Sequence, residues 1–236
     1  MNLKKLKNNI YYTESDKEYD RPVLGYIKGK DFSIMVDSGN SKKHIDLYMK
    51  LLEKNNLSIP KYCLITHWHW DHTFGLNFIN FKTFSHKKTD EKLREMKEWK
   101  WNDEAMKKRL ENGIEIEFAD IHIRKEYENL NDIIIKNVDE TIENKKIFNL
   151  GDISCEYFHL PSAHSDDSMV IYIPEEKIIF LGDIYNDDFY NNHYRDIEKT
   201  KKLYEELNKL DFKIAVLGHG EPIEKEKLIN FLRQFF

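Results

Sequence analysis

The sequence predicts a protein of the α+β class, and two observations predict it. Short apolar runs bounded by Gly, Asp, Asn or Pro recur in both halves of the chain, as expected for buried β-strands. Between them lie segments whose apolar residues recur at intervals of three and four, the period of an amphipathic helix. Several expected strands end in histidine or carboxylate residues, which indicates a site at strand ends.

The first part of the chain alternates between strands and one clear helix. Strands are expected at 10–12, 23–27, 32–36, 62–65 and 82–85, with a hairpin turn at 29–31. Ser41 is a suitable N-cap for a helix whose apolar residues follow at helical spacing. These are Ile45, Tyr48, Leu51 and Leu52. A further short helix is expected at 75–79.

Residues 87–112 are rich in charge and predict a helical insertion that ends at Gly113. Its apolar residues are Leu93, Met96, Trp99, Met106 and Leu110. Trp99 and Trp101 are expected to face the core, with a lid over the active site as the alternative.

The second half predicts more strands and ends in two helices. The strands are expected at 114–118, 133–135, 146–150, 153–158, 169–173, 177–181 and 213–217. Pro174 lies in a hairpin turn between two of them. One helix begins at about Thr200, and a final helix carries Ile223, Leu228, Ile229, Leu232 and Phe235.

Composition narrows the range of functions. The chain has 236 residues, a net charge of −5 and a pI near 6.1, so general attraction to nucleic acid is not expected. Cys63 and Cys155 lie in apolar runs and predict buried thiols rather than a disulfide framework. No secretory signal and no membrane-spanning run of about 20 apolar residues is found, so a cytoplasmic protein is expected.

The chemistry concentrates in Thr66–His72, which holds three of the ten histidines and one aspartate. Imidazole and carboxylate are ligands that zinc, iron and manganese accept. His67 and His69 are two residues apart and would point the same way in an extended segment. Asp71 and His72 follow where the chain must turn, so they can diverge towards a second ion. The cluster therefore predicts two neighbouring metals rather than one.

The segment His67-Trp68-His69-Trp70-Asp71-His72 resembles the metallo-β-lactamase superfamily, whose hallmark is His-x-His-x-Asp-His. The family pattern needs four further positions in a set order, each at a strand end. Asp37, His164, Asp183 and His219 occupy them in that order. The usual glycine before the third-motif histidine is Ala163 here, a small departure.

The resemblance covers nearly the whole chain and implies a single domain, residues 1–236, with the helical insertion at about 87–112. The implied fold is a four-layer αββα sandwich of two mixed sheets packed face to face, with helices outside and the metal site at one edge. By the resemblance, one ion takes His67, His69 and His164, and the other takes Asp71, His72 and His219. Asp183 bridges them, and Asp37 holds the ligand loops from behind.

The implied cofactors are two divalent ions, expected to be zinc, with iron or manganese as alternatives. A hydroxide shared between them would attack an ester, thioester, lactone or related bond. Asp71 and Asp183 are the expected catalytic carboxylates, Asp71 passing a proton to the leaving group. The net positive charge of such a site favours a small anionic substrate. Common zinc β-lactamases carry Cys where Asp183 stands, which argues for a hydrolase of the glyoxalase II and lactonase type.

Other functions stay open. A mononuclear iron sulfur (persulfide) dioxygenase keeps the same histidines, and a phosphodiesterase or nuclease can share the fold. The chain lacks the basic, glycine-rich arm of such nucleases, and His69 stands where flavin-linked di-iron members have Glu. The expected partner is a small-molecule substrate, with no nucleic acid or membrane, and the oligomeric state is open. The loop 185–195 offers candidate substrate-binding residues: Tyr185, Asn186, Tyr190, His193 and Tyr194.

Overall fold

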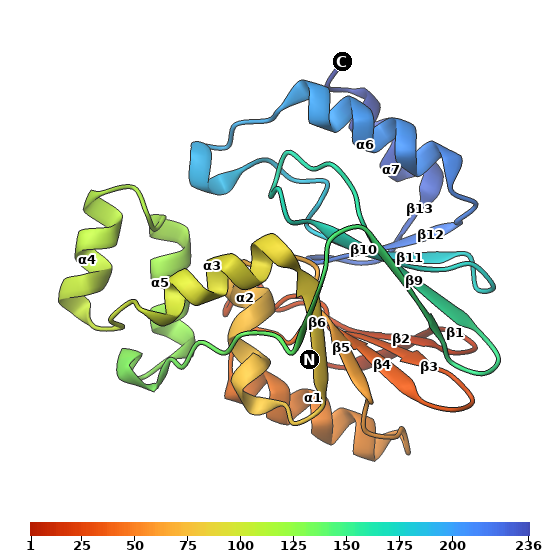
Figure 1. Ribbon diagram of the computed structural model, residues 1–236, viewed down its shortest axis with the longest axis horizontal. Coiled ribbons are helices and arrows are strands. Elements are labelled where there is room, and N and C mark those ends of the chain that lie inside the picture. The colour runs from red at the N-terminus through yellow and green to blue at the C-terminus, as the bar shows by residue number, and fades with distance from the viewer.

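The computed structural model describes all 236 residues, which form two β-sheets packed face to face with helices on their outer faces (Figure 1). The first sheet has seven strands in chain order: β1 (Leu3–Lys7), β2 (Ile10–Thr13), β3 (Gly25–Lys28), β4 (Ser33–Val36), β5 (Tyr62–Leu64), β6 (Lys82–His86) and β7 (Glu140–Ile142). The second has six, in the order β13 (Ile223–Glu224), β12 (Ile214–Leu217), β11 (Ile178–Gly182), β10 (Met169–Ile173), β9 (Ser154–His159) and β8 (Lys145–Asn149).

Both sheets are mixed, and their parallel pairs position the site. β4, β5 and β6 run parallel in the first sheet, as do β11 and β12 in the second. The carboxyl ends of parallel neighbours lie at one edge of a sheet, which is where open α/β sheets place ligands. Asp37 follows β4, the histidine segment follows β5, Asp183 follows β11 and His219 follows β12.

Successive side chains along a strand point to opposite faces of its sheet, and each face packs against a different layer of the protein. In β10, Met169, Ile171 and Ile173 face the cluster between the sheets, whereas Val170 and Tyr172 face the cluster under the C-terminal helices. All five residues of β10 are buried, because the sheet is covered on both faces. Each fully buried aliphatic side chain contributes about 1.5–3 kcal/mol of hydrophobic stabilisation.

The helices complete the outer layers. α1 (Lys42–Lys54), capped by the Ser41 hydroxyl, covers the outer face of the first sheet, and α6 (Ile197–Lys209) and α7 (Lys225–Arg233) cover that of the second (Figure 1). α3 (Lys87–Lys97), α4 (Asp103–Glu111) and α5 (Glu117–Glu126) form an arm on the left of Figure 1. The shorter elements are α2 (Trp70–Thr73), η1 (Phe74–Phe78), η2 (Leu130–Asp132) and η3 (Phe189–Asn191).

The predicted sandwich is therefore confirmed. Most expected elements are present within a few residues, and no helix of the structure is both long and apolar enough to cross a membrane. Three short strands, β1, β7 and β13, were not expected. The predicted insertion at 87–112 is two helices, because the chain leaves helical conformation between Lys97 and Asp103.

Two predicted strands are wrong. Residues 133–135 form no strand, and residues 114–118 lead into α5. The alternation of Ile114, Ile116 and Phe118 imitates a strand, but the longer pattern is helical. Ala119 and Ile123 are buried one turn apart. Acidic residues in the first turn and basic residues in the last turn match the helix dipole.

Candidate metal centre

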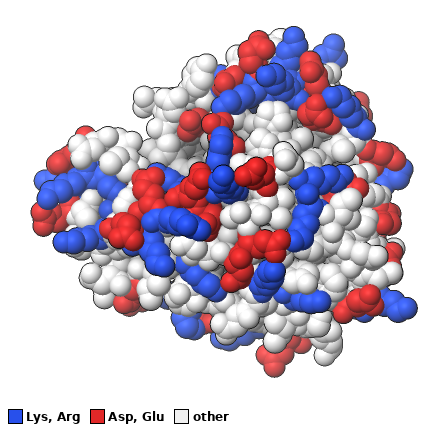
Figure 2. Space-filling view, in the orientation of Figure 1, with Lys and Arg blue, Asp and Glu red and all other residues white.

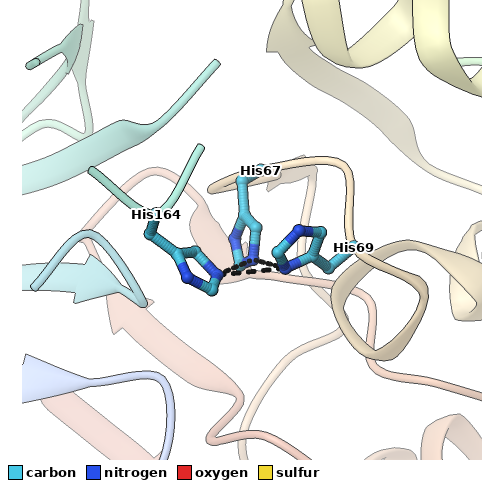
Figure 3. Close-up of side chains that lie close together, drawn as sticks. All are labelled: His67, His69 and His164. Atoms are coloured by element: carbon cyan, nitrogen blue, oxygen red, sulfur yellow. Dashed lines mark hydrogen bonds between the residues drawn. The ribbon is translucent and has the colours of Figure 1, made fainter. Parts of the chain in front are cut away.

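Three histidines from both sheets converge on one point (Figure 3). Nε2 of His67 lies 3.0 Å from Nδ1 of His69, and Nε2 of His164 lies 3.3 Å from the His67 atom and 3.0 Å from the His69 atom. All three side chains are buried. We call them the three-histidine group.

This spacing fits a metal ion. Zinc bound tetrahedrally at about 2.0–2.1 Å from each nitrogen holds its ligands about 3.3 Å apart. Three nitrogens turned towards one another cannot all act as hydrogen-bond partners in neutral imidazoles, since each ring has a single N–H. The donor set therefore fits a cation such as zinc, iron or manganese.

The opposite ring nitrogens fix two of these imidazoles. Nδ1 of His164 lies 2.7 Å from the backbone carbonyl oxygen of Asp187, which can only accept, so His164 donates there. Nε2 is then left free for the metal. Nδ1 of His67 lies 3.0 Å from the Thr66 hydroxyl. Hydrogen bonds of this kind orient ligating histidines and set their tautomer.

A second group lies beside the first. Oδ2 of Asp71 is 3.0 Å from Nε2 of His72 and 3.0 Å from Nε2 of His219. α2 begins at Trp70, and its turn sends Asp71 and His72 in a different direction from His67 and His69. This arrangement, the Asp71–His72–His219 group, could hold another ion.

Asp183 lies between the two groups. Its Oδ2 is 3.6 Å from Nε2 of His219, 3.9 Å from Nε2 of His72 and 3.9 Å from Nε2 of His164. Gly218 makes room for this carboxylate, because a Cβ atom there would lie 2.0 Å from its Oδ1. The position suits a carboxylate that bridges two ions.

Two atoms of the site are buried and lack any hydrogen-bond partner, namely Nε2 of His72 and Oδ1 of Asp183. A buried polar atom without a partner costs about 1–3 kcal/mol. Both belong to side chains that face the other candidate ligands. A bound cation would satisfy them, so the residues present fit a metal centre.

Asp37 supports the site from behind. It accepts hydrogen bonds from the backbone N–H of Thr66 (2.7 Å) and from its hydroxyl (3.0 Å), and lies 2.8 Å from Nδ1 of His72. Its φ of 58° lies in the left-handed region, which non-glycine residues adopt at a cost of about 1–3 kcal/mol.

Protonation differs between the two groups. Burial and the neighbouring imidazoles hold the pKa of His67 and of His69 well below its usual range, so both are neutral and ready for a metal. Burial also lowers the pKa of His72, but the Asp71 and Asp37 carboxylates outweigh it and raise that pKa well above normal. Burial opposes the shift at His219 too, yet Asp183 and Asp71 raise its pKa to about 9. A metal binding to the second group must therefore displace protons.

Sequence comparison places this site in a known family. A family model described as the metallo-beta-lactamase superfamily matches residues 23–219, which span every residue of both groups. The chain belongs to the metallo-beta-lactamase superfamily.

Solved structures of similar fold agree. The chain resembles the DIM-1 metallo-beta-lactamase with a TM-score of 0.68 at 18% identity, covering 99% of this chain and 98% of that one. A metallo-beta-lactamase from Pontibacter korlensis gives 0.65 at 19%, covering 98% of each chain. The inverting sec-alkylsulfatase Pisa1 from Pseudomonas sp. gives 0.66 at 12%, with 99% of this chain and 40% of that one covered. The predicted superfamily enzyme, a hydrolase with a His/Asp metal-binding cluster, is confirmed at that level.

A cavity of about 340 Å³ opens beside the superfamily site. His69, Asp71, His164, Asp183 and His219 reach it. Of the predicted substrate-binding residues, Tyr185, Asn186 and Tyr190 line it as well. Because the cavity touches members of both groups, a molecule bound there would lie against the metal centre.

His193 and Tyr194 do not line this cavity. The chain turns at Asn192 and His193, whose φ values of 51° and 57° are left-handed, and this turn carries both side chains outward. They lie instead at a shallow surface depression, and Tyr194 is 58% exposed. Residue-by-residue prediction within an aperiodic loop could not anticipate this turn.

Several lining residues were missed by sequence reasoning. Ile116, Phe118 and Ala119 form a wall at the start of α5, because the segment predicted as a strand leads into this helix. Lys17 and Asp20 come from the loop between β2 and β3, where no motif marks them. The helical spacing of Ile116, Ala119 and Ile123 is the signal that could have located the wall.

The predicted core position of Trp99 and Trp101 agrees with the structure. Trp101 is buried in the cluster that includes Phe74, and Trp99 packs against the same cluster. Neither lines the cavity. The walls of this cavity come from α5 and from residues 185–190, and no residue of 87–112 lines it.

Proposed function

We propose that the chain is a dinuclear metal hydrolase that cleaves an ester, thioester or lactone bond in a small anionic molecule. The observation that carries the proposal is the position of Asp183, whose Oδ2 lies within 3.9 Å of ligand nitrogens from both groups. A mononuclear site would not need the Asp71–His72–His219 group or a carboxylate between two groups.

In this proposal the three-histidine group would hold one ion, the Asp71–His72–His219 group would hold the other, and Asp183 would bridge them. Zinc is the preferred metal because it suits a mixture of imidazole and carboxylate ligands. Two divalent ions would supply a water of lowered pKa and an electrophile for the oxygen that gains charge.

The chain's own residues do the rest. Asp71 lines the cavity, where its carboxylate can take a proton from the attacking water and return it to the leaving group. Tyr185 donates a hydrogen bond of 3.3 Å to the carbonyl oxygen of His219 and so holds that ligand loop in place. The apolar wall of Ile116, Phe118 and Ala119 excludes water from the face opposite the ligands.

Substrate choice follows from the lining. Asp183 stands where common zinc β-lactamases use a thiolate, and neither buried cysteine reaches the cavity. This supports an acyl ester, thioester or lactone over a β-lactam. On the face drawn in Figure 2, basic and acidic side chains are interspersed without an extended basic patch, which supports a small molecule over nucleic acid on that face.

A panel assay tests the proposal. Zinc-loaded and iron-loaded protein are each given a thioester, an ester, a lactone, a phosphodiester, a β-lactam and a persulfide, with hydrolysis and oxygen uptake both recorded. We expect zinc-dependent hydrolysis of at least one acyl substrate, with kcat/KM at least about tenfold above the phosphodiester and β-lactam. Oxygen uptake with the persulfide on iron-loaded protein alone, or no hydrolysis at all, would overturn it.

The variant Asp183→Ala tests the bridging role of this carboxylate. Losing the bridging carboxylate should remove one of two ions and reduce turnover by at least about a hundredfold, while the unfolding transition remains cooperative. Asp211→Asn, which alters an exposed aspartate paired with Lys177, should change neither quantity. Full activity in Asp183→Ala would contradict the bridging role.

A further inference from the structure

Two cavities meet at the metal centre, and the second is not needed by the proposed reaction. The first is the substrate cavity of about 340 Å³. The second has a volume of about 370 Å³ and lies on the other side of the same ligands. Three side chains line both of them, namely His69, His164 and Tyr190.

These three side chains separate the two cavities, and we call them the partition. Tyr190 is the member of the partition that can be replaced. Nδ1 of His69 and Nε2 of His164 are 3.0 Å apart, and both rings are committed to the three-histidine group. The ring of Tyr190 packs beside them, with its centroid 5.1 Å from that of His69 and 5.0 Å from that of Trp68. Removing this ring would therefore join the two spaces while leaving every candidate ligand in place, although His69 would lose a packing neighbour.

A hydrogen bond across the site holds the ring in place. The Tyr190 hydroxyl lies 2.9 Å from Oε1 of Glu115, in the linker between α4 and α5. Glu115 is buried, and its Oε1 also accepts the N–H of Ile116. The bond ties the arm to the loop after β11, which lie on the same side of the sandwich (Figure 1). Glu115 thus acts as a positioning residue for Tyr190.

The two cavities differ in chemistry. The first has the apolar wall of α5. The second is lined by three lysines, Lys88, Lys92 and Lys199, and by three aspartates, Asp166, Asp167 and Asp188. Nζ of Lys92 lies 5.2 Å from the Trp68 ring, and Lys199 pairs with Asp166 at 2.6 Å. A chain that entered the second cavity would gain more from a neutral polar end, which can hydrogen-bond to both kinds of charged group, than from an apolar end.

We propose that Tyr190, held by Glu115, sets the length of the substrate that the site accepts. With the ring in place, the site takes a compact acyl group that fills the first cavity, which lies near the lower end of the range for small-molecule sites. Without it, the second cavity receives the polar end of a longer acyl chain. This inference rests on the proposed hydrolase function.

The experiment uses zinc-loaded protein and a series of thioesters of one thiol. Their acyl chains lengthen stepwise and end in either methyl or carboxamide. Tyr190→Ala should raise kcat/KM for the longest carboxamide-ended thioester by about tenfold or more relative to the shortest, mainly through KM. The methyl-ended series should gain less, because only a carboxamide can hydrogen-bond to the charged groups of the second cavity.

Further variants distinguish the effect of the Tyr190 ring from the effect of its hydrogen bond to Glu115. Tyr190→Phe keeps the ring but lacks the hydroxyl that donates to Glu115, so it should shift the length profile towards longer chains as Glu115→Ala does, and by less than Tyr190→Ala. Glu115→Ala should shift the profile towards longer chains, whereas Glu115→Gln keeps an acceptor and should restore it. Tyr194→Ala alters an exposed tyrosine outside both cavities and should leave the profile unchanged. If Tyr190→Ala does not fold, Tyr190→Leu shortens the side chain while retaining contact with Trp68.

A second readout does not depend on activity. His69 and His164 already line both cavities, and removing the Tyr190 ring widens the opening around them, so metal should pass to a coloured chelator about threefold faster or more in Tyr190→Ala than in Tyr194→Ala. If wild-type protein hydrolyses no ester, thioester or lactone, the proposed function fails, and chelator access still tests the partition. If wild-type protein is active but Tyr190→Ala and Tyr190→Leu change neither length profile nor metal release, the inference is overturned.

Discussion

Nδ1 of His72 lies 2.8 Å from Oδ2 of Asp37, and both side chains are buried. The two residues are 35 positions apart, on segments that follow the adjacent parallel strands β4 and β5. The contact directs Nε2 of His72 towards Asp71. The Asp37 carboxylate, at the edge of the first sheet, therefore orients His72, which is a candidate ligand.

Asp37→Asn should weaken metal binding without removing a ligand. The amide cannot accept from Thr66 and His72 as a carboxylate does, so one ion should bind about 10–100-fold more weakly. Metal titration of the apoprotein measures this affinity. Asp46→Asn, on the exposed face of α1, is the control and should bind as wild type does. Equal affinities in the two variants would show that Asp37 does not orient His72.

Elemental analysis should find close to two transition-metal ions per chain. Each ion present at 100–1,000 times its dissociation constant adds about 3–4 kcal/mol to the free energy of unfolding. Chelation should therefore lower the Tm, since it leaves the converging imidazoles and carboxylates of the site without a cation, and zinc should restore it. The metal centre would be contradicted if carefully purified protein contained no metal and its Tm did not change when zinc was added.

Glu115→Gln should stabilise the protein at neutral pH. Burial raises the pKa of the Glu115 carboxyl above its ordinary value, so the folded state holds this proton more tightly than the unfolded state does. Stability from this group is thus fully present below about pH 4.5 and is lost as the pH rises through the folded pKa. The difference in Tm between Glu115→Gln and wild type, measured across this range, should grow with pH. A difference that does not vary with pH would argue against the buried carboxylate.

Arg21→Ala should strongly destabilise the fold. The Arg21 guanidinium donates to both carboxylate oxygens of Glu126 at 2.9–3.1 Å, in a buried pair that fastens the loop carrying Lys17 and Asp20 to α5. Leaving Glu126 buried without its partner should cost about 3–5 kcal/mol. Lys42→Ala, which removes an exposed pair with Asp46, should cost less than about 1 kcal/mol. Chemical denaturation distinguishes these values, and similar losses in both variants would refute the special role of Arg21.

The sequence by itself determined the sandwich and the family. Short apolar runs marked most strands, and the motif residues from Asp37 to His219 each followed one of them. Ligand identity can be predicted this way because a rigid strand end leaves little freedom in where the next side chain points. The structure brings all seven predicted ligand residues close together, and their roles as metal ligands stay a prediction.

Only the tertiary structure decided which residues surround the cavity. Ile114–Phe118 alternates like a strand but leads into α5, because burial of Ala119 and Ile123 against the core outweighs local pattern. Within residues 185–195, Tyr190 faces the site and Tyr194 faces solvent, since a left-handed turn lies between them. The Tyr190–Glu115 contact spans 75 positions and leaves no periodic trace. Periodicity in the sequence shows which residues share one face of a helix or strand. It does not show which loops meet, because that depends on how the sheets and helices pack together.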